Sequence, residues 1–265
     1  MSRILALVCL CSLAACSNTT LEGAQGNEAV IEGRKSFTIT SSDGFTVFGH
    51  LHRPDGFEFS DSIGVPLILA FHQGGASGEA EYAPIIPRLR QNGYAVLTID
   101  QRRGGNRFMG NNRTAAAFEG KNVSYCDAYG DLEAAFSYAI KLDGITEIIA
   151  WGSSYSATLA VKLAVNHPEL ITGVLAFSPA SGEPMTGCSV LPLAFQVKQP
   201  VLFLRPESEM SLGSVAADLT AFARMGHETY IASPGAHGSS MLVSDRVEGN
   251  TSDTWAIVFS FLNRL

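Results

Sequence analysis

The chain has 265 residues, of which 46% are hydrophobic, 16% charged and 9% aromatic. This composition suffices for one large domain with a substantial core, and the lack of blocks of like charge excludes intrinsic disorder. The formal net charge is -7 and no stretch is rich in Lys and Arg, so binding to nucleic acid is not expected.

Residues 1–15 have the pattern of a secretory signal peptide. Arg3 supplies one positive charge, and the apolar run that follows it, residues 4–10, is too short to cross a bilayer as a helix. The signal ends in Leu13-Ala14-Ala15-Cys16, which closely resembles the lipobox of bacterial lipoproteins. This resemblance implies cleavage before Cys16 and acyl chains on its sulfur and amine, which would anchor the protein in a membrane.

An ordinary signal peptide cut at the same small residues would instead release a free periplasmic protein. Ser17 follows Cys16, and by resemblance a residue other than Asp at this position favours the outer membrane of a Gram-negative cell, facing the periplasm or the cell surface. Residues 16–34 are polar and without an apolar period, which predicts a tether. Residues 35–265 are then expected to form a single domain.

Two cysteines, Cys126 and Cys188, lie in the predicted domain, since Cys9 and Cys11 leave with the signal and Cys16 would carry lipid. An even pair in an oxidising compartment favours one disulfide bond. The alternative is two small buried apolar side chains.

The domain alternates predicted strands and helices. Apolar and polar residues alternate on both sides of Ser42-Asp43-Gly44, which predicts a β-hairpin. Continuous apolar runs farther along predict strands buried on both faces of a parallel sheet. In chain order, we expect strands at 36–40, 45–51, 66–71, 94–99, 147–151, 173–177, 201–204 and 228–232, and helices at 79–92, 127–142, 155–167, 213–225 and 252–265.

One hairpin followed by alternating strands and helices implies an α/β architecture, with a mostly parallel eight-stranded sheet and helices on both faces. Roughly twenty residues separate the strands at 173–177 and 201–204, which is too few for a substantial cap domain. We therefore expect little or no cap over the active-site face.

The strand at 147–151 runs into a helix through Gly152-x-Ser154-x-Ser156. A nucleophile on a sharp strand-to-helix turn needs small residues two positions before and after it, because the turn brings those positions together. Ser154 satisfies this requirement, although Ser156 stands where the usual motif has Gly. The alternative is a structural serine cluster. We interpret Ser154 as a candidate nucleophile.

His237 lies in Gly235-Ala236-His237-Gly238, between the last predicted strand and the last predicted helix. A catalytic histidine reaches the active site from a loop at this point of the chain when the order is serine, acid, histidine. The alternative for a single histidine is an ordinary surface residue. We interpret His237 as the general base.

The carboxylate that orients the histidine is expected in the loop after the strand at 201–204. Counting from Pro200 places Glu209 at that position, and Ser-Glu-His triads are a recognised variant. Pro206 replaces the Gly of the common pattern, so Glu207 remains a second candidate and Glu183 a third.

These stretches together resemble the α/β-hydrolase superfamily, in its dienelactone-hydrolase-like and small-esterase branch. The resemblance covers about residues 37–265 and rests on Ser154, His237 and two further stretches, Phe71-His72-Gln73-Gly74-Gly75 and Ile99-Asp100-Gln101-Arg102-Arg103-Gly104-Gly105. In this superfamily the residue after the first histidine, or the next one, donates its backbone N–H to the oxyanion. The resemblance thus implies an oxyanion hole made by Tyr155 with Gln73 or Gly74. Dienelactone hydrolases proper use a cysteine nucleophile, whereas Ser154 indicates ordinary ester chemistry.

The resemblance implies hydrolysis of a small or polymeric carboxylic ester through an acyl-enzyme. A serine peptidase or an acyltransferase with the same triad is one alternative, and a non-catalytic envelope lipoprotein that keeps the fold is another. Neither a metal nor a cofactor is expected. The sequence has no His pair at i, i+4 and no Cys-x-x-Cys, and its Gly-rich pieces lack a P-loop Lys and a G-x-G-x-x-G pattern.

Overall fold

The computed structural model describes residues 33–57, 64–118 and 123–265, which belong to the compact unit Glu32–Leu265. The predicted signal peptide, Cys16 and the predicted tether up to residue 32 lie outside the described residues. Among the residues described, no helix has both the length and the apolar character needed to cross a bilayer.

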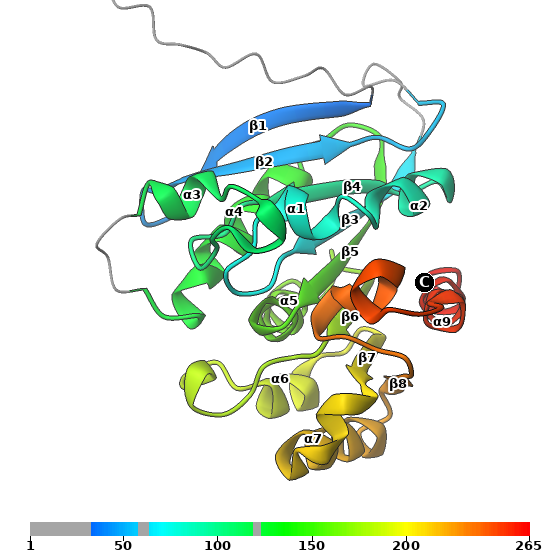
Figure 1. Cartoon of the computed structure of the whole chain (residues 1–265). Coiled ribbons are helices and arrows are strands. Elements are labelled where there is room, and N and C mark those ends of the chain that lie inside the picture. Colours follow the sequence, from blue (N-terminus) through cyan, green and yellow to red (C-terminus); the bar gives the residue numbers. More distant parts are fainter. Residues whose placement is uncertain (1–32, 58–63, 119–122) are drawn as a thin grey trace, which may run out of the picture. The chain divides into compact units, whose positions relative to one another are not determined.

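The described residues form a sheet of eight strands in the order β1-β2-β4-β3-β5-β6-β7-β8 (Figure 1). β1 pairs with β2, and β2 with β4, in antiparallel orientation, while the other neighbouring pairs are parallel. The prediction of a mostly parallel eight-stranded sheet is confirmed. The strands are β1 Arg34–Thr40, β2 Thr46–His52, β3 Val65–Phe71, β4 Ala95–Ile99, β5 Ile145–Ser153, β6 Gly173–Phe177, β7 Val201–Pro206 and β8 Glu228–Ala232.

Helices cover both faces of this sheet. Successive side chains of a strand point to opposite faces, so one strand supplies apolar side chains to the clusters on both faces. Along β3, Leu67 and Leu69 belong to one apolar cluster, while Ile68 belongs to another. The first cluster includes residues of α4, α5, α6 and α7, and the second includes residues of α1, α2 and α9. The helices are α1 Gly78–Tyr82, α2 Ile86–Gln91, α3 Arg113–Ala116, α4 Tyr129–Ala139, α5 Tyr155–Asn166, α6 Val190–Gln196, α7 Gly213–Arg224, α8 Ser244–Val247 and α9 Ser252–Leu262.

The prediction of one helix over residues 79–92 is wrong, because the segment forms two helices, α1 and α2. Pro84 has no N–H to donate to the carbonyl of Ala80, so the hydrogen-bond ladder of α1 cannot continue through it. The guanidinium of Arg246 supplies the missing donors, giving hydrogen bonds of 3.0 Å to the Ala80 carbonyl and 2.9 Å to the Glu81 carbonyl. Arg246 thereby ties α8 to the end of α1.

Other differences concern the bounds of helices and one helix that the sequence does not predict. The helix predicted at 127–142 is α4, preceded by the 3₁₀ turn Cys126–Ala128, and the last helix ends at Leu262. The sequence predicts no helix between β6 and β7, whereas the structure has the short helix α6 there, with Pro192 in its first turn. Together with the 3₁₀ turn Glu183–Met185, α6 is the regular structure in that fully described connection, which contains no cap domain.

Cys126 and Cys188 form a disulfide bond with their Cα atoms 5.8 Å apart, which confirms the predicted pair. The bond joins the 3₁₀ turn before α4 to the segment before α6. Tyr125 directly precedes Cys126, and its ring packs against the ring of Tyr155 with 4.7 Å between centroids. The disulfide therefore restrains a segment that contacts the first residue of α5.

Candidate active site

Ser154 occupies the sharp turn between β5 and α5, with φ 62° and ψ -123°. An L-residue other than glycine rarely adopts this conformation, and such residues concentrate at functional sites. A Cβ on Gly152 would lie 2.3 Å from the Ser156 carbonyl oxygen and 2.5 Å from backbone atoms of Ala157. Only glycine fits two residues before Ser154, which is the close approach that the sequence motif predicts.

Ser156, which stands where the usual motif has glycine, is fully buried and hydrogen-bonded. Its hydroxyl donates to the backbone carbonyl of His72 at 2.6 Å and accepts from the Gln101 amide at 2.9 Å. The Ser156 side chain therefore links the first turn of α5 to the ends of β3 and β4.

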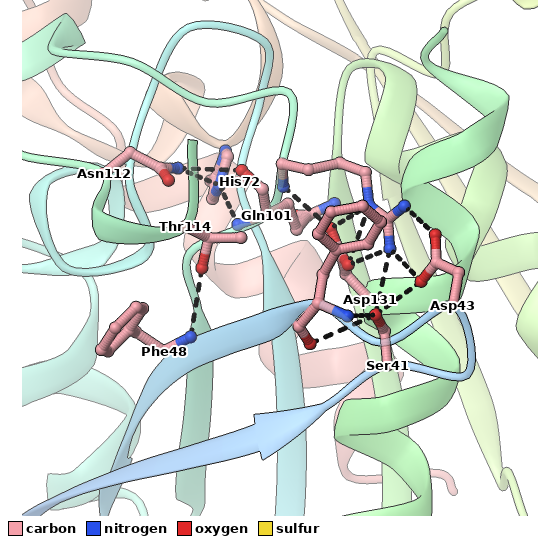
Figure 2. Close-up of polar contacts among 10 residues, drawn as sticks. Ser41, Asp43, Phe48, His72, Gln101, Asn112, Thr114 and Asp131 are labelled. Atoms are coloured by element: carbon pink, nitrogen blue, oxygen red, sulfur yellow. Dashed lines mark hydrogen bonds and ion pairs between the residues drawn. The ribbon is translucent and has the colours of Figure 1, made fainter. Parts of the chain in front are cut away.

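His72 is buried and holds the loop after β3 rather than acting as a base (Figure 2). Its Nε2 accepts the backbone N–H of Gln101 at 2.8 Å, so Nδ1 carries the proton and donates to the Gln73 carbonyl at 2.7 Å. Burial lowers the pKa of the His72 ring, which agrees with a neutral imidazole. Asn112 also lies against this ring, with its Nδ2 atom 3.2 Å from Nε2.

His237 contacts Glu209 across the ends of β7 and β8. The distance from His237 Nδ1 to Glu209 Oε1 is 2.5 Å, and Arg205 donates to Oε2 of the same carboxylate at 2.8 Å. Burial raises the pKa of Glu209, but the hydrogen bonds from His237 and Arg205 outweigh it and hold the pKa below its usual range. Glu209 is thus an ionised partner for the His237 ring.

The other two candidate acids lie elsewhere. Glu207 accepts a hydrogen bond from the Ser233 hydroxyl at 2.6 Å, and Glu183 is an exposed residue of the 3₁₀ turn after β6. Among the three carboxylates that the sequence offers, Glu209 is the one with a contact to His237.

The segment after His237 is anchored on the residue before Ser154. The Ser239 N–H donates to the Ser153 hydroxyl at 3.0 Å, and a Cβ on Gly238 would lie 2.2 Å from that oxygen and 3.9 Å from the Ser154 nitrogen. Within the part of the chain that the structure describes, the Ser154 hydroxyl and the His237 ring form no hydrogen bond. In enzymes without bound substrate this contact is often long and tightens only in the complex.

Of the predicted oxyanion donors, Tyr155 is the first residue of α5, so its N–H has no partner within the helix. The Gln73 N–H donates to the carboxylate of Glu81 at 2.7 Å and is therefore occupied. For the Gly74 N–H, no acceptor is found among the described residues. A Cβ on Gly74 would lie 3.0 Å from the Tyr125 hydroxyl, so a larger residue would crowd this position.

A cavity of about 320 Å³ lies beside His237. Of its lining residues, Gln73 and His237 are the two predicted from the sequence as site residues. Arg107 and Phe108 come from the loop after β4, and Arg246 comes from α8, where no local motif marks a site. The lining residues are Gln73, Arg107, Phe108, Ala236, His237, Ser240 and Arg246.

Several solved structures share this architecture. An esterase from Pyrococcus furiosus matches with a TM-score of 0.66 and 18% identity, over 87% of this chain and 90% of the esterase. An acylaminoacyl peptidase from Pyrococcus horikoshii matches with a TM-score of 0.63 and 18% identity, over 87% of this chain but 41% of the peptidase. A dipeptidyl aminopeptidase IV homologue from Bacteroides ovatus matches with a TM-score of 0.55 and 17% identity, over 75% of this chain and 32% of the aminopeptidase chain.

No family model matches the sequence, and no curated protein matches it. At these identities the structural likeness defines the fold. The chain has the α/β-hydrolase fold, as its sequence motifs predict.

Proposed function

We propose that this protein is a serine hydrolase that cleaves carboxylic esters. The observation that carries the proposal is the His237–Glu209 pair, on a segment anchored beside a serine in the strained turn between β5 and α5. A nucleophile, a base and an orienting acid in this order are the components of acyl transfer on this fold.

In this reaction the Ser154 hydroxyl oxygen attacks the ester carbonyl carbon. Glu209 accepts a hydrogen bond from the Nδ1–H group of His237, which leaves Nε2 free to take the Ser154 proton and then to give it to the leaving alcohol. Water attacks the acyl-enzyme by the same steps and releases the acid. The N–H groups of Tyr155 and Gly74 are the proposed donors to the oxyanion, and a donor of this kind contributes about 2.7–4 kcal/mol to transition-state stabilisation.

A fluorophosphonate probe tests the proposal, since it reacts with activated serines. We expect the purified protein to be labelled at Ser154, with the label mapped by peptide mass, and Ser154→Ala to remove it. Ser137→Ala, at an exposed serine on α4, is the matched control and should keep full labelling. A folded protein that takes no label would contradict the proposal and favour a binding module.

The substrate class follows from a second comparison on the same protein. A panel of p-nitrophenyl esters is expected to be hydrolysed faster than aminoacyl p-nitroanilides. The opposite ranking would favour the peptidase alternative, and transfer of the acyl group to an added alcohol would favour an acyltransferase.

We also propose that Cys16 carries lipid and tethers the enzyme to the outer membrane. The support is the lipobox-like sequence Leu13-Ala14-Ala15-Cys16 and the polar stretch that follows it. Radiolabelled palmitate should be incorporated into the wild-type protein and not into Cys16→Ser. Equal incorporation into both proteins would show that the lipid is attached at a residue other than Cys16.

A further inference from the structure

A buried carboxyl group on α1 contacts the loop that contains the proposed oxyanion donor. The side chain of Glu81 is fully buried, and its Oε2 atom accepts the Gln73 N–H at 2.7 Å. Its Oε1 atom accepts no hydrogen bond from a described residue. Neither the triad nor the oxyanion hole uses this group.

Two segments of the site contact Glu81. The first is the loop after β3, whose Gln73 N–H donates to the carboxylate. The second is α8, where Arg246 donates to the backbone carbonyl of Glu81 at 2.9 Å and its charge lowers the pKa of the carboxyl.

Burying this carboxyl is unfavourable unless its charge is compensated. Burial raises the pKa of Glu81 to about 6, against the opposing effects of Ser153, the Gln73 N–H, Arg246 and His237. An apolar side chain would fill the same space without this cost. The carboxylate is therefore best explained by the contacts that it makes.

We infer that Glu81 is a positioning residue of the proposed reaction, whose carboxylate fixes the Gln73 N–H and with it the orientation of the next peptide group, which carries the Gly74 N–H. This inference rests on the proposed function. By occupying the Gln73 N–H, Glu81 makes the neighbouring Gly74 the donor that works with Tyr155. Glu81 itself does not touch the reacting atoms.

Two variants separate the acceptor from the apolar volume. Glu81→Leu removes the acceptor, and we expect kcat on a p-nitrophenyl ester to fall by about 10²-fold with little change in KM, as when an oxyanion donor is displaced. Glu81→Gln keeps an oxygen that can accept the Gln73 N–H, and should restore most of kcat. Amide hydrogen exchange should show the Gln73 N–H protected in the wild type and in Glu81→Gln, and fast in Glu81→Leu.

Leu89→Ala is the control, because Leu89 is a buried apolar residue on α2, outside the loop after β3, the turn between β5 and α5 and the His237 segment. It should lower the melting temperature and leave kcat unchanged. If it lowers kcat as much as Glu81→Leu does, or if Glu81→Leu keeps wild-type kcat and exchange, the inference is overturned. A wild-type protein without hydrolysis or Ser154 labelling would instead overturn the proposed function, while the exchange data would still report whether Glu81 holds Gln73.

Discussion

Glu209→Gln is expected to lower kcat by about 10⁴-fold, as an amide does when it replaces the orienting carboxylate of a serine triad. The carboxylate accepts a hydrogen bond from the Nδ1–H group of His237, with 2.5 Å between Nδ1 and Oε1, and so fixes the ring tautomer. A glutamine can present its NH₂ group instead, which would stabilise the tautomer with the proton on Nε2 and leave no base for Ser154. KM should change little, since Glu209 is not among the residues that line the cavity beside His237. Steady-state kinetics on one ester measures both constants.

Glu207→Gln is the matched control, two residues away on the same 3₁₀ turn, where the carboxylate accepts from Ser233. We expect its kcat to stay near that of the wild type. Melting temperatures of both variants show whether each remains folded, which matters because Glu209 also accepts from Arg205. An equal loss of kcat in both variants, or a loss only in Glu207→Gln, would contradict the assignment of Glu209 as the orienting acid.

Asp131→Ala is expected to lower the free energy of unfolding by about 3 kcal/mol, because the buried guanidinium of Arg102 loses its fully buried carboxylate partner and keeps only Asp43. Asp131 on α4 is fully buried and accepts three hydrogen bonds from Arg102: its backbone N–H at 2.8 Å, Nε at 3.0 Å and Nη2 at 2.7 Å. The same guanidinium binds Asp43 in the β1–β2 turn (Figure 2). Arg102 thereby connects the hairpin, the end of β4 and α4.

The measurement is equilibrium unfolding in urea, from which the free energy is extrapolated to water. Asp143→Ala removes an exposed carboxylate from the loop that follows α4 and should shift the free energy by less than about 0.5 kcal/mol. If the midpoints of the two variants coincide, Arg102 does not need Asp131 to remain buried.

The sheet could be predicted from the sequence because its parallel strands are buried on both faces and therefore appear as continuous apolar runs. β6 and β8 have the predicted bounds, and the other strands differ from prediction by at most two residues at either end. The helices were harder, because apolar spacing over residues 79–92 predicts one helix while Pro84 divides the segment into α1 and α2. In that segment a local hydrogen-bonding constraint outweighs the periodicity.

The candidate nucleophile and histidine could be located because each lies in a short motif at a strand end, where the chain order restricts the choice. The acid could not be fixed, since Pro206 disrupts the pattern and only the fold shows which glutamate contacts His237. Glu81 could not be found at all. In the sequence it is one of two acidic residues in the first turn of a predicted helix, a position that favours carboxylates for reasons unrelated to a site. Its burial depends on α8 and the His237 segment, which lie far along the chain.

The backbone conformation of Ser154 determines how a substitution at this position affects stability. A side chain held at φ 62° opposes folding by about 1–3 kcal/mol, and glycine would adopt the same conformation without that cost. The proposed nucleophile is therefore a strained residue in an otherwise well-packed turn. Replacing it with glycine would improve stability rather than harm it, so under the proposed function stability and catalysis favour different residues at this one position.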